Sequence, residues 1–165
     1  MANDIAIIWD NETQTGDIEY SGSDLVIENG LTSSVILSLF CDDRSTDDSG
    51  ITNPDDKRGG WGNLLSDNED VTGLGSNLWL LSREKVTQET LNLTEQYATD
   101  SLQWMIDDGV VASVEAVATN SGNITNPILN LQIKLFFEDE DTRVIKFADL
   151  WNKQFSDNYY LTKES

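Results

Sequence analysis

Three glycines around one tryptophan are the most informative feature of this chain, and the first chemistry to test against them is phosphate binding. The stretch KRGGWGN places Gly59, Gly60 and Gly62 beside Trp61, just after the basic residue Arg58. A phosphate-binding loop needs Lys followed by Ser or Thr after its last glycine, and a helix that begins there. An Asn-Leu pair follows instead. The stretch therefore favours a tight turn that places Trp61 in a pocket, while the Arg58 guanidinium is suited to a bidentate contact with a carboxylate.

Clusters of carboxylates are the second candidate. They lie at Asp42-Asp43, Asp47-Asp48, Asp67 to Asp70 and Glu138 to Asp141. Such oxygen ligands suit calcium, but no cluster has the ligand spacing and central glycine of an EF-hand loop. Solvated loop charge is the favoured interpretation. A paired-carboxylate hydrolase stays open, because that chemistry needs only two positioned acids.

The chain has no histidine and a single cysteine, Cys41. Without histidine there is no Ser-His-Asp or Cys-His activation of a nucleophile, and the commonest transition-metal ligand is missing. One cysteine provides neither a disulfide framework nor a cysteine zinc site, and we expect Cys41 to be buried rather than reactive. Any remaining enzyme chemistry must use carboxylates, Lys, Tyr or a hard metal. Since no such pattern here is specific, we assign no catalytic, cofactor-binding or metal-binding residue.

The formal net charge is −20, from 30 acidic and 10 basic residues. Such a surface repels nucleic acid and disfavours an anionic membrane, so we predict neither as a partner. Proteins with basic patches, or cations, fit better. The N-terminus has no signal-peptide pattern, and no run approaches the roughly 18 apolar residues of a membrane helix. Synthesis in a cytoplasm is the expectation.

The first half of the chain predicts short strands, a helix and a long loop. Residues 5–9, 17–20 and 24–27 are apolar or alternating runs separated by turn residues, as in hairpins. Residues 31–41 have apolar side chains at helical spacing and predict a short buried helix, with a strand as the alternative. Residues 42–74 are acidic and rich in turn residues, so we expect a partly mobile loop anchored by Trp61.

The second half predicts a longer helix followed by a sheet. Residues 76–82 are expected to continue into a second helix. The helix of residues 88–108 has Thr87 as N-cap, and Gly109 after Asp108 as its left-handed end. Alternation then predicts strands at residues 110–118, 128–137 and 143–147, with Leu129, Leu131, Ile133 and Leu135 on one face. Residues 148–151 suggest a helical turn. The tryptophans Trp79, Trp104 and Trp151 fit core packing better than a ligand site.

These elements predict an α+β fold in one domain of 165 residues. An N-terminal β-hairpin region with a short helix spans residues 1–41, and the acidic loop spans residues 42–74. The α+β core of residues 75–151 packs its long helix on an antiparallel sheet. A polar tail occupies residues 152–165.

The order of several motifs resembles the protein forty-six family of Mu-like phage baseplates. These motifs are DIAIIWD, GLTSSVILSLFCDDR, RGGWGN, GSNLWLLSREKVT, LQWMIDDGVV and FADLW, within residues 4–151. The family typically has Arg-Gly-Trp-Trp-Gly-Asp where this chain has RGGWGN, so Gly60 and Asn63 depart from it. Residues 75–151 are also similar to the short wedge protein, or sheath initiator, of contractile tails. Many of those relatives carry Glu-Pro-Arg after the helix. Asp107 to Val110 stand there instead, so a contact of that motif is not transferred.

The resemblance implies a structural virion protein in the baseplate wedge of a contractile tail, in several copies around a sixfold axis. The implied partners are larger wedge proteins, the tail hub or tube, and the sheath, whose first ring it would help to initiate. Strand sharing through an edge at residues 128–137 or 143–147 is one expected mode of contact. The candidate interface residues are Arg58, Gly59, Gly60, Trp61, Gly62, Gly75, Ser76, Trp79, Asp108, Gly109 and Trp151. A carboxylate-based glycosidase acting on cell wall, and a calcium-dependent binding module, are the alternative functions.

Overall fold

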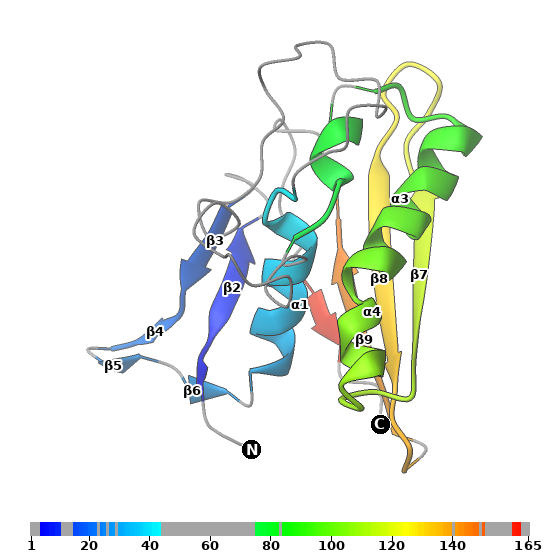
Figure 1. Cartoon of the computed structure of the whole chain (residues 1–165). Coiled ribbons are helices and arrows are strands. Elements are labelled where there is room, and N and C mark those ends of the chain that lie inside the picture. The colour runs from blue at the N-terminus through cyan, green and yellow to red at the C-terminus, as the bar shows by residue number, and fades with distance from the viewer. Residues whose placement is uncertain are drawn as a thin grey trace.

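Helices cover one face of a four-stranded sheet, and a small N-terminal strand region lies beside the first helix (Figure 1). This computed structural model describes residues 4–10, 15–22, 24–25, 27–28, 30–43, 75–82, 84–139, 141–148, 150 and 160–162. The predicted α+β fold is confirmed. The predicted loop of residues 42–74 lies almost entirely outside the described residues.

The N-terminal strands are short and antiparallel. They are β1 (Asp4–Ile5), β2 (Ile7–Asp10), β3 (Thr15–Ile18), β4 (Tyr20–Ser21), β5 (Asp24–Leu25) and β6 (Ile27–Glu28). β2 pairs with β3, β1 with β6, and β4 with β5. The Glu19 N–H donates to the Ala6 carbonyl across 3.0 Å, which continues the β2–β3 ladder. The predicted hairpin region is therefore present.

Helix α1 (Leu31–Phe40) confirms the helical interpretation of residues 31–41. Val35, Ile36 and Leu39 are buried, because their spacing puts them on the face of the helix that points to the core. The Ser33 hydroxyl joins the helix to the hairpin: it accepts from the Ile7 N–H across 2.8 Å and donates to the Ile5 carbonyl across 3.3 Å.

The helix predicted for residues 88–108 is bent into two pieces, α3 (Gln88–Ser101) and α4 (Gln103–Asp107). Its predicted N-cap is confirmed, since the Thr87 side chain accepts from the Thr90 N–H. The bend lies at Leu102, so the prediction of one continuous helix over residues 88–108 was wrong at this point. The hydroxyls of Thr99 and Ser101 donate to carbonyls of the preceding turn, and such bonds bend helices.

Residues 76–82 do not continue into that helix. They contain a single 3₁₀ turn, η2 (Leu78–Leu81), and α3 begins seven residues after its end. The difference has a local cause. Residues 85–87 have no regular structure, and the Thr90 hydroxyl holds this stretch by donating to the Lys85 carbonyl across 2.6 Å.

The C-terminal sheet has the order β10-β9-β8-β7 and is antiparallel throughout. Its strands are β7 (Ser113–Asn120), β8 (Leu129–Phe136), β9 (Thr142–Phe147) and β10 (Tyr160–Thr162). Leu129, Leu131, Ile133 and Leu135 are all buried, as the alternation predicted. The predicted polar tail thus contributes a strand.

The strand order corrects one prediction. Residues 128–137 form β8, which is paired on both sides and offers no edge. Residues 143–147 form β9, whose outer side pairs with β10 from Val144 to Lys146. Strand order depends on tertiary packing, so alternation alone did not reveal it.

Aromatic rings connect the N-terminal region to the sheet. Trp9 stacks on Phe40 with ring centroids 3.6 Å apart, and Phe40 meets Phe147 edge-on at 5.0 Å. Trp104 packs against the same core and donates its indole N–H to the Ser38 hydroxyl across 3.0 Å. Leu150 lies buried in a turn, and its N–H bonds to the Leu129 carbonyl. The core-packing interpretation of Trp104 is correct.

Candidate partner-binding site

The candidate interface residues divide into three sets. Arg58, Gly59, Gly60, Trp61, Gly62 and Trp151 lie outside the described residues. Gly75, Ser76 and Trp79 come together at the end of α1. Asp108 and Gly109 form a separate turn after α4. The structure therefore brings one group of three together, and the contact of these residues with a partner stays a prediction.

Gly75 occupies a backbone position that requires glycine. Its φ is 126°, a conformation that residues with a side chain rarely adopt. A Cβ added there would lie 2.7 Å from the Cys41 carbonyl oxygen and 3.0 Å from the Asp43 nitrogen. The lack of a side chain lets two distant stretches of backbone touch.

Ser76 fastens this crossing. Its N–H donates to the Cys41 carbonyl across 2.9 Å, and its carbonyl accepts from the Asp43 N–H across 3.0 Å. Its hydroxyl donates to the Leu39 carbonyl and accepts from the Leu78 N–H. Ser76 is only 4% exposed, so these bonds are shielded from water.

Trp79 adds a further hydrogen bond to the same junction. Its indole N–H donates to the Asp43 carbonyl across 3.0 Å. The chain leaves the described region after Asp43 and returns at Gly75. Asp43 and Gly75 are therefore held close together, and KRGGWGN lies between them in the sequence.

Asp108 and Gly109 terminate α4 in a Schellman motif. The Gly109 N–H donates to the Ile106 carbonyl, and the Val110 N–H donates to the Met105 carbonyl. Gly109 has a φ of 68°, as its predicted left-handed position requires. The turn is exposed, with apolar Val110 at the surface.

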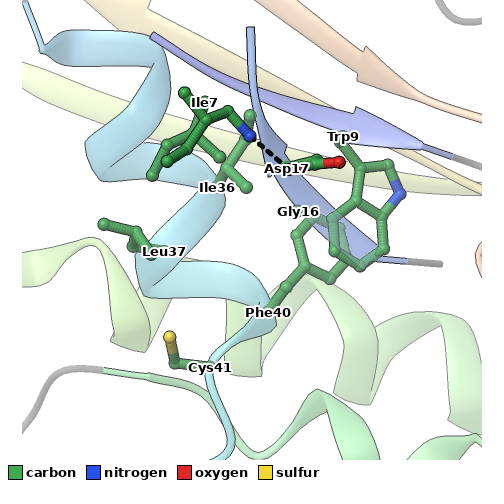
Figure 2. A pocket seen from close by; sticks show the side chains of 9 residues that line it. Ile7, Trp9, Gly16, Asp17, Ile36, Leu37, Phe40 and Cys41 are labelled. Atoms are coloured by element: carbon green, nitrogen blue, oxygen red, sulfur yellow. Dashed lines mark hydrogen bonds between the residues drawn. The ribbon is translucent and has the colours of Figure 1, made fainter. Parts of the chain in front are cut away.

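The sequence interpretation missed an apolar pocket between the hairpin and α1 (Figure 2). The residues that line it are Ile7, Trp9, Gly16, Asp17, Ile18, Ile36, Leu37, Phe40 and Cys41. A signal existed: once β2 and β3 pair, Gly16 lies opposite Trp9 and leaves room beside the large ring.

Cys41 lies at the helix end of this pocket and is partly exposed. Burial, and then the negative charge of Asp42, raise the pKa of its thiol above 9.0. A thiol with a raised pKa is a weak nucleophile at neutral pH. The prediction of a buried Cys41 is therefore wrong in part, because the residue at the end of α1 keeps some contact with solvent, whereas the raised pKa fits a thiol of low reactivity.

The part of the chain that the structure describes contains no group of three or more Cys, Asp or Glu side chains arranged to hold a metal. Among the same residues, no helix is long and apolar enough to cross a membrane.

The Trp9 indole N–H and the Arg143 Nε are buried without a hydrogen-bond partner. The Arg143 guanidinium lies 5.5 Å from the centre of the Phe137 ring.

Comparison with known proteins gives consistent matches. A family model described as phage protein GP46 matches residues 31–142, from the start of α1 to the start of β9. The chain is 40% identical over 116 residues to baseplate protein gp46 of Escherichia phage Mu, covering 70% of this chain and 76% of that protein. It is 33% identical over 150 residues to Mu-like prophage FluMu protein gp46 of Haemophilus influenzae, covering 91% and 98% respectively.

Proposed function

This chain belongs to the phage protein GP46 family, and from that membership we propose that it is a structural subunit of a phage tail baseplate without a catalytic role. The observation that carries the proposal is the similarity to the Mu protein, whose name describes it as a baseplate protein. The virion tail is then the site of action.

In the finer proposal, the chain is a wedge component that packs with larger wedge proteins around the tail hub or tube. It is present in several copies with sixfold symmetry, and it helps to initiate the sheath. The net charge of −20 supports partners with basic surfaces, because complementary charge speeds encounter and disfavours wrong partners. Repetition around the axis would strengthen weak individual contacts.

The corrected strand order limits where a sheath strand can add. β8 is interior, and the outer side of β9 is taken by β10, which pairs through only three residues. The other outer strand is β7, where the Glu95 carboxylate of α3 already accepts from the Ala118 N–H. We therefore propose that a sheath strand takes the place of β10 against β9. A chain that lacks residues 159–165 would then recruit sheath at least as well as the full chain. Loss of sheath recruitment by that truncation would instead favour addition outside β10.

The test of the main proposal is a deletion in a phage or prophage that carries this gene. Deletion should abolish sheathed tails in electron micrographs, and a tagged copy should restore them and purify with the particles. Normal tails without the protein would contradict a structural role.

A cell-wall zymogram of the same purified protein addresses the glycosidase alternative. Clear lysis that is lost on a single Asp or Glu to Ala substitution would replace the structural role by catalysis. Calorimetric titration with calcium addresses the binding-module alternative, and the absence of calcium uptake would remove it.

A further inference from the structure

The pocket between the β2–β3 hairpin and α1 has a volume of about 440 Å³. This lies within the range of about 300–1,000 Å³ that is typical of sites for ligands in proteins. Figure 2 shows its construction: Ile7, Trp9 and Gly16 come from the two strands, while Ile36, Leu37, Phe40 and Cys41 come from the helix and its end. The pocket therefore lies between the β2–β3 hairpin and α1, and both elements contribute to its walls.

The walls of the pocket are held in place. Trp9 belongs to the buried core cluster, and the ring of Phe40 stacks on it and packs against the same cluster. The Ser33 hydroxyl bonds α1 to both Ile5 and Ile7. A Cβ at Gly16 would lie 3.4 Å from Ile7 Cγ2, so a larger side chain there would enter this space. A pocket with fixed walls requires little reorganisation to bind.

Apolar side chains continue from the pocket onto the surface. Ile18 is 40% exposed on the strand side, and Leu37 is 37% exposed on the helix side. Tyr20, two residues beyond Ile18, is also exposed, and residues two apart on an extended chain point to the same side. Ile18 and Leu37 both line the pocket, so its apolar surface reaches the solvent on both rims as one patch, and such a patch suits the apolar side chains of a polypeptide segment.

Negative charge borders this patch. Asp17 is among the lining residues, and the Asp42 charge acts on the Cys41 thiol at the other end. None of the described lining residues is Lys or Arg. The chain as a whole carries 30 acidic and 10 basic residues, so long-range charge also favours a basic partner.

We propose that this pocket seats one or two large apolar side chains from a short segment of another tail protein, with Lys or Arg beside them in that segment. The inference rests on the proposed baseplate role, which provides the neighbouring protein. The apolar side chains bury against Ile7, Trp9 and Leu37, and the cations lie near Asp17 and Asp42.

Cys41 provides a direct probe, because it is the single cysteine of the chain and lines the pocket. Its rate of alkylation by N-ethylmaleimide is measured by mass spectrometry in the free protein and in purified tails. We expect the rate to be at least about tenfold lower in tails, since a segment seated in the pocket would block the access of the reagent to the Cys41 thiol.

Leu37→Asp should reduce incorporation into tails by about tenfold or more, because it places charge in the apolar rim. The matched control is Ile124→Asp, at a fully exposed apolar residue in the loop between β7 and β8. That variant should be incorporated normally. Thermal melts of both free variants check that the fold is retained, and Ile18→Asp is a second variant on the opposite rim.

Equal alkylation of Cys41 in free protein and in tails would overturn the inference, as would normal incorporation of both rim variants. Faster alkylation of the free Trp61→Ala protein would show that the chain's own segment fills the pocket. Protection that increases with the concentration of free protein would identify a second copy as the occupant. Absence of the chain from tails would refute the baseplate role itself, so the two failures are distinguishable.

Discussion

The Glu95 carboxylate on α3 accepts a hydrogen bond from the backbone N–H of Ala118 across 2.9 Å. Ala118 lies on β7, an outer strand of the sheet. Ser121 bonds toward β8, and donors alternate in direction along an antiparallel strand, so the N–H of Ala118 points away from the sheet. A helix side chain thus occupies a backbone donor that another strand would otherwise use.

Replacement of Glu95 by Ala should therefore both destabilise the fold and expose the edge. A hydrogen bond to a charged group contributes about 1.5–3 kcal/mol, and partial exposure here reduces the expected loss to about 1 kcal/mol. An open edge promotes pairing between molecules. Urea unfolding measures the first effect, and sedimentation velocity at increasing concentration measures the second.

Glu95→Gln is the matched control, because its amide oxygen can still accept the bond. It should stay monomeric at concentrations where the Ala variant associates. Equal association of the two variants would mean that the hydrogen bond does not protect this edge.

Gly75→Ala should be among the most destabilising single changes in the described chain. The substitution meets both an unfavourable φ and a close approach to the Cys41 carbonyl, so we expect a loss of about 3 kcal/mol in the free energy of unfolding. Gly22 is the control, since its φ is 70° but nothing lies within 4 Å of an added Cβ.

Gly22→Ala should lower the free energy of unfolding by only about 1 kcal/mol, which is the cost of a side chain in the left-handed backbone conformation. Chemical denaturation of both variants gives the comparison. Equal losses would contradict a steric role for Gly75 at the crossing with Cys41 to Asp43.

Ser76→Ala tests the bonds at the same junction. The change removes a buried hydroxyl that serves the Leu39 carbonyl and the Leu78 N–H, and leaves both groups short of a partner. A loss of about 1–3 kcal/mol is expected. Ser82→Ala is the control, since that hydroxyl is exposed and bonds only within its own turn. A similar loss of unfolding free energy in both variants would contradict a special role for the hydrogen bonds of Ser76 at the junction.

Patterns that lie within one element could be predicted from the sequence. The alternation of Leu129 to Leu135, the Thr87 cap and the Gly109 terminus all depend on neighbouring residues, and each is present. The bend at Leu102 was missed because hydroxyl bonds to the preceding turn compete with the helix without disturbing its apolar period.

Features that join distant residues could not be predicted in this way. Gly75 and Ser76 are candidate interface residues from the sequence, but their partners lie more than thirty residues earlier, at Leu39 to Asp43. The pocket likewise depends on the β2–β3 register, which places Gly16 opposite Trp9. Only the tertiary structure gives these relationships.

The Cys41 thiol should make the stability depend on pH in the alkaline range. Its pKa in the folded protein is raised above 9.0, first by burial and then by Asp42. The folded state therefore disfavours the thiolate. The stability that this provides is complete below pH 9 and is lost as pH rises through the folded pKa.

The difference in unfolding free energy between the wild type and Cys41→Ser isolates this effect, because serine does not ionise in this range. This difference should be constant from pH 7 to 8, and above pH 9 the wild type should lose stability relative to Cys41→Ser. Asp42→Asn should lower the pKa and speed alkylation of Cys41 by less than about tenfold, since burial, the larger cause, remains. An unchanged alkylation profile in Asp42→Asn would contradict a contribution from the neighbouring charge, and a pH-independent difference would contradict the raised pKa.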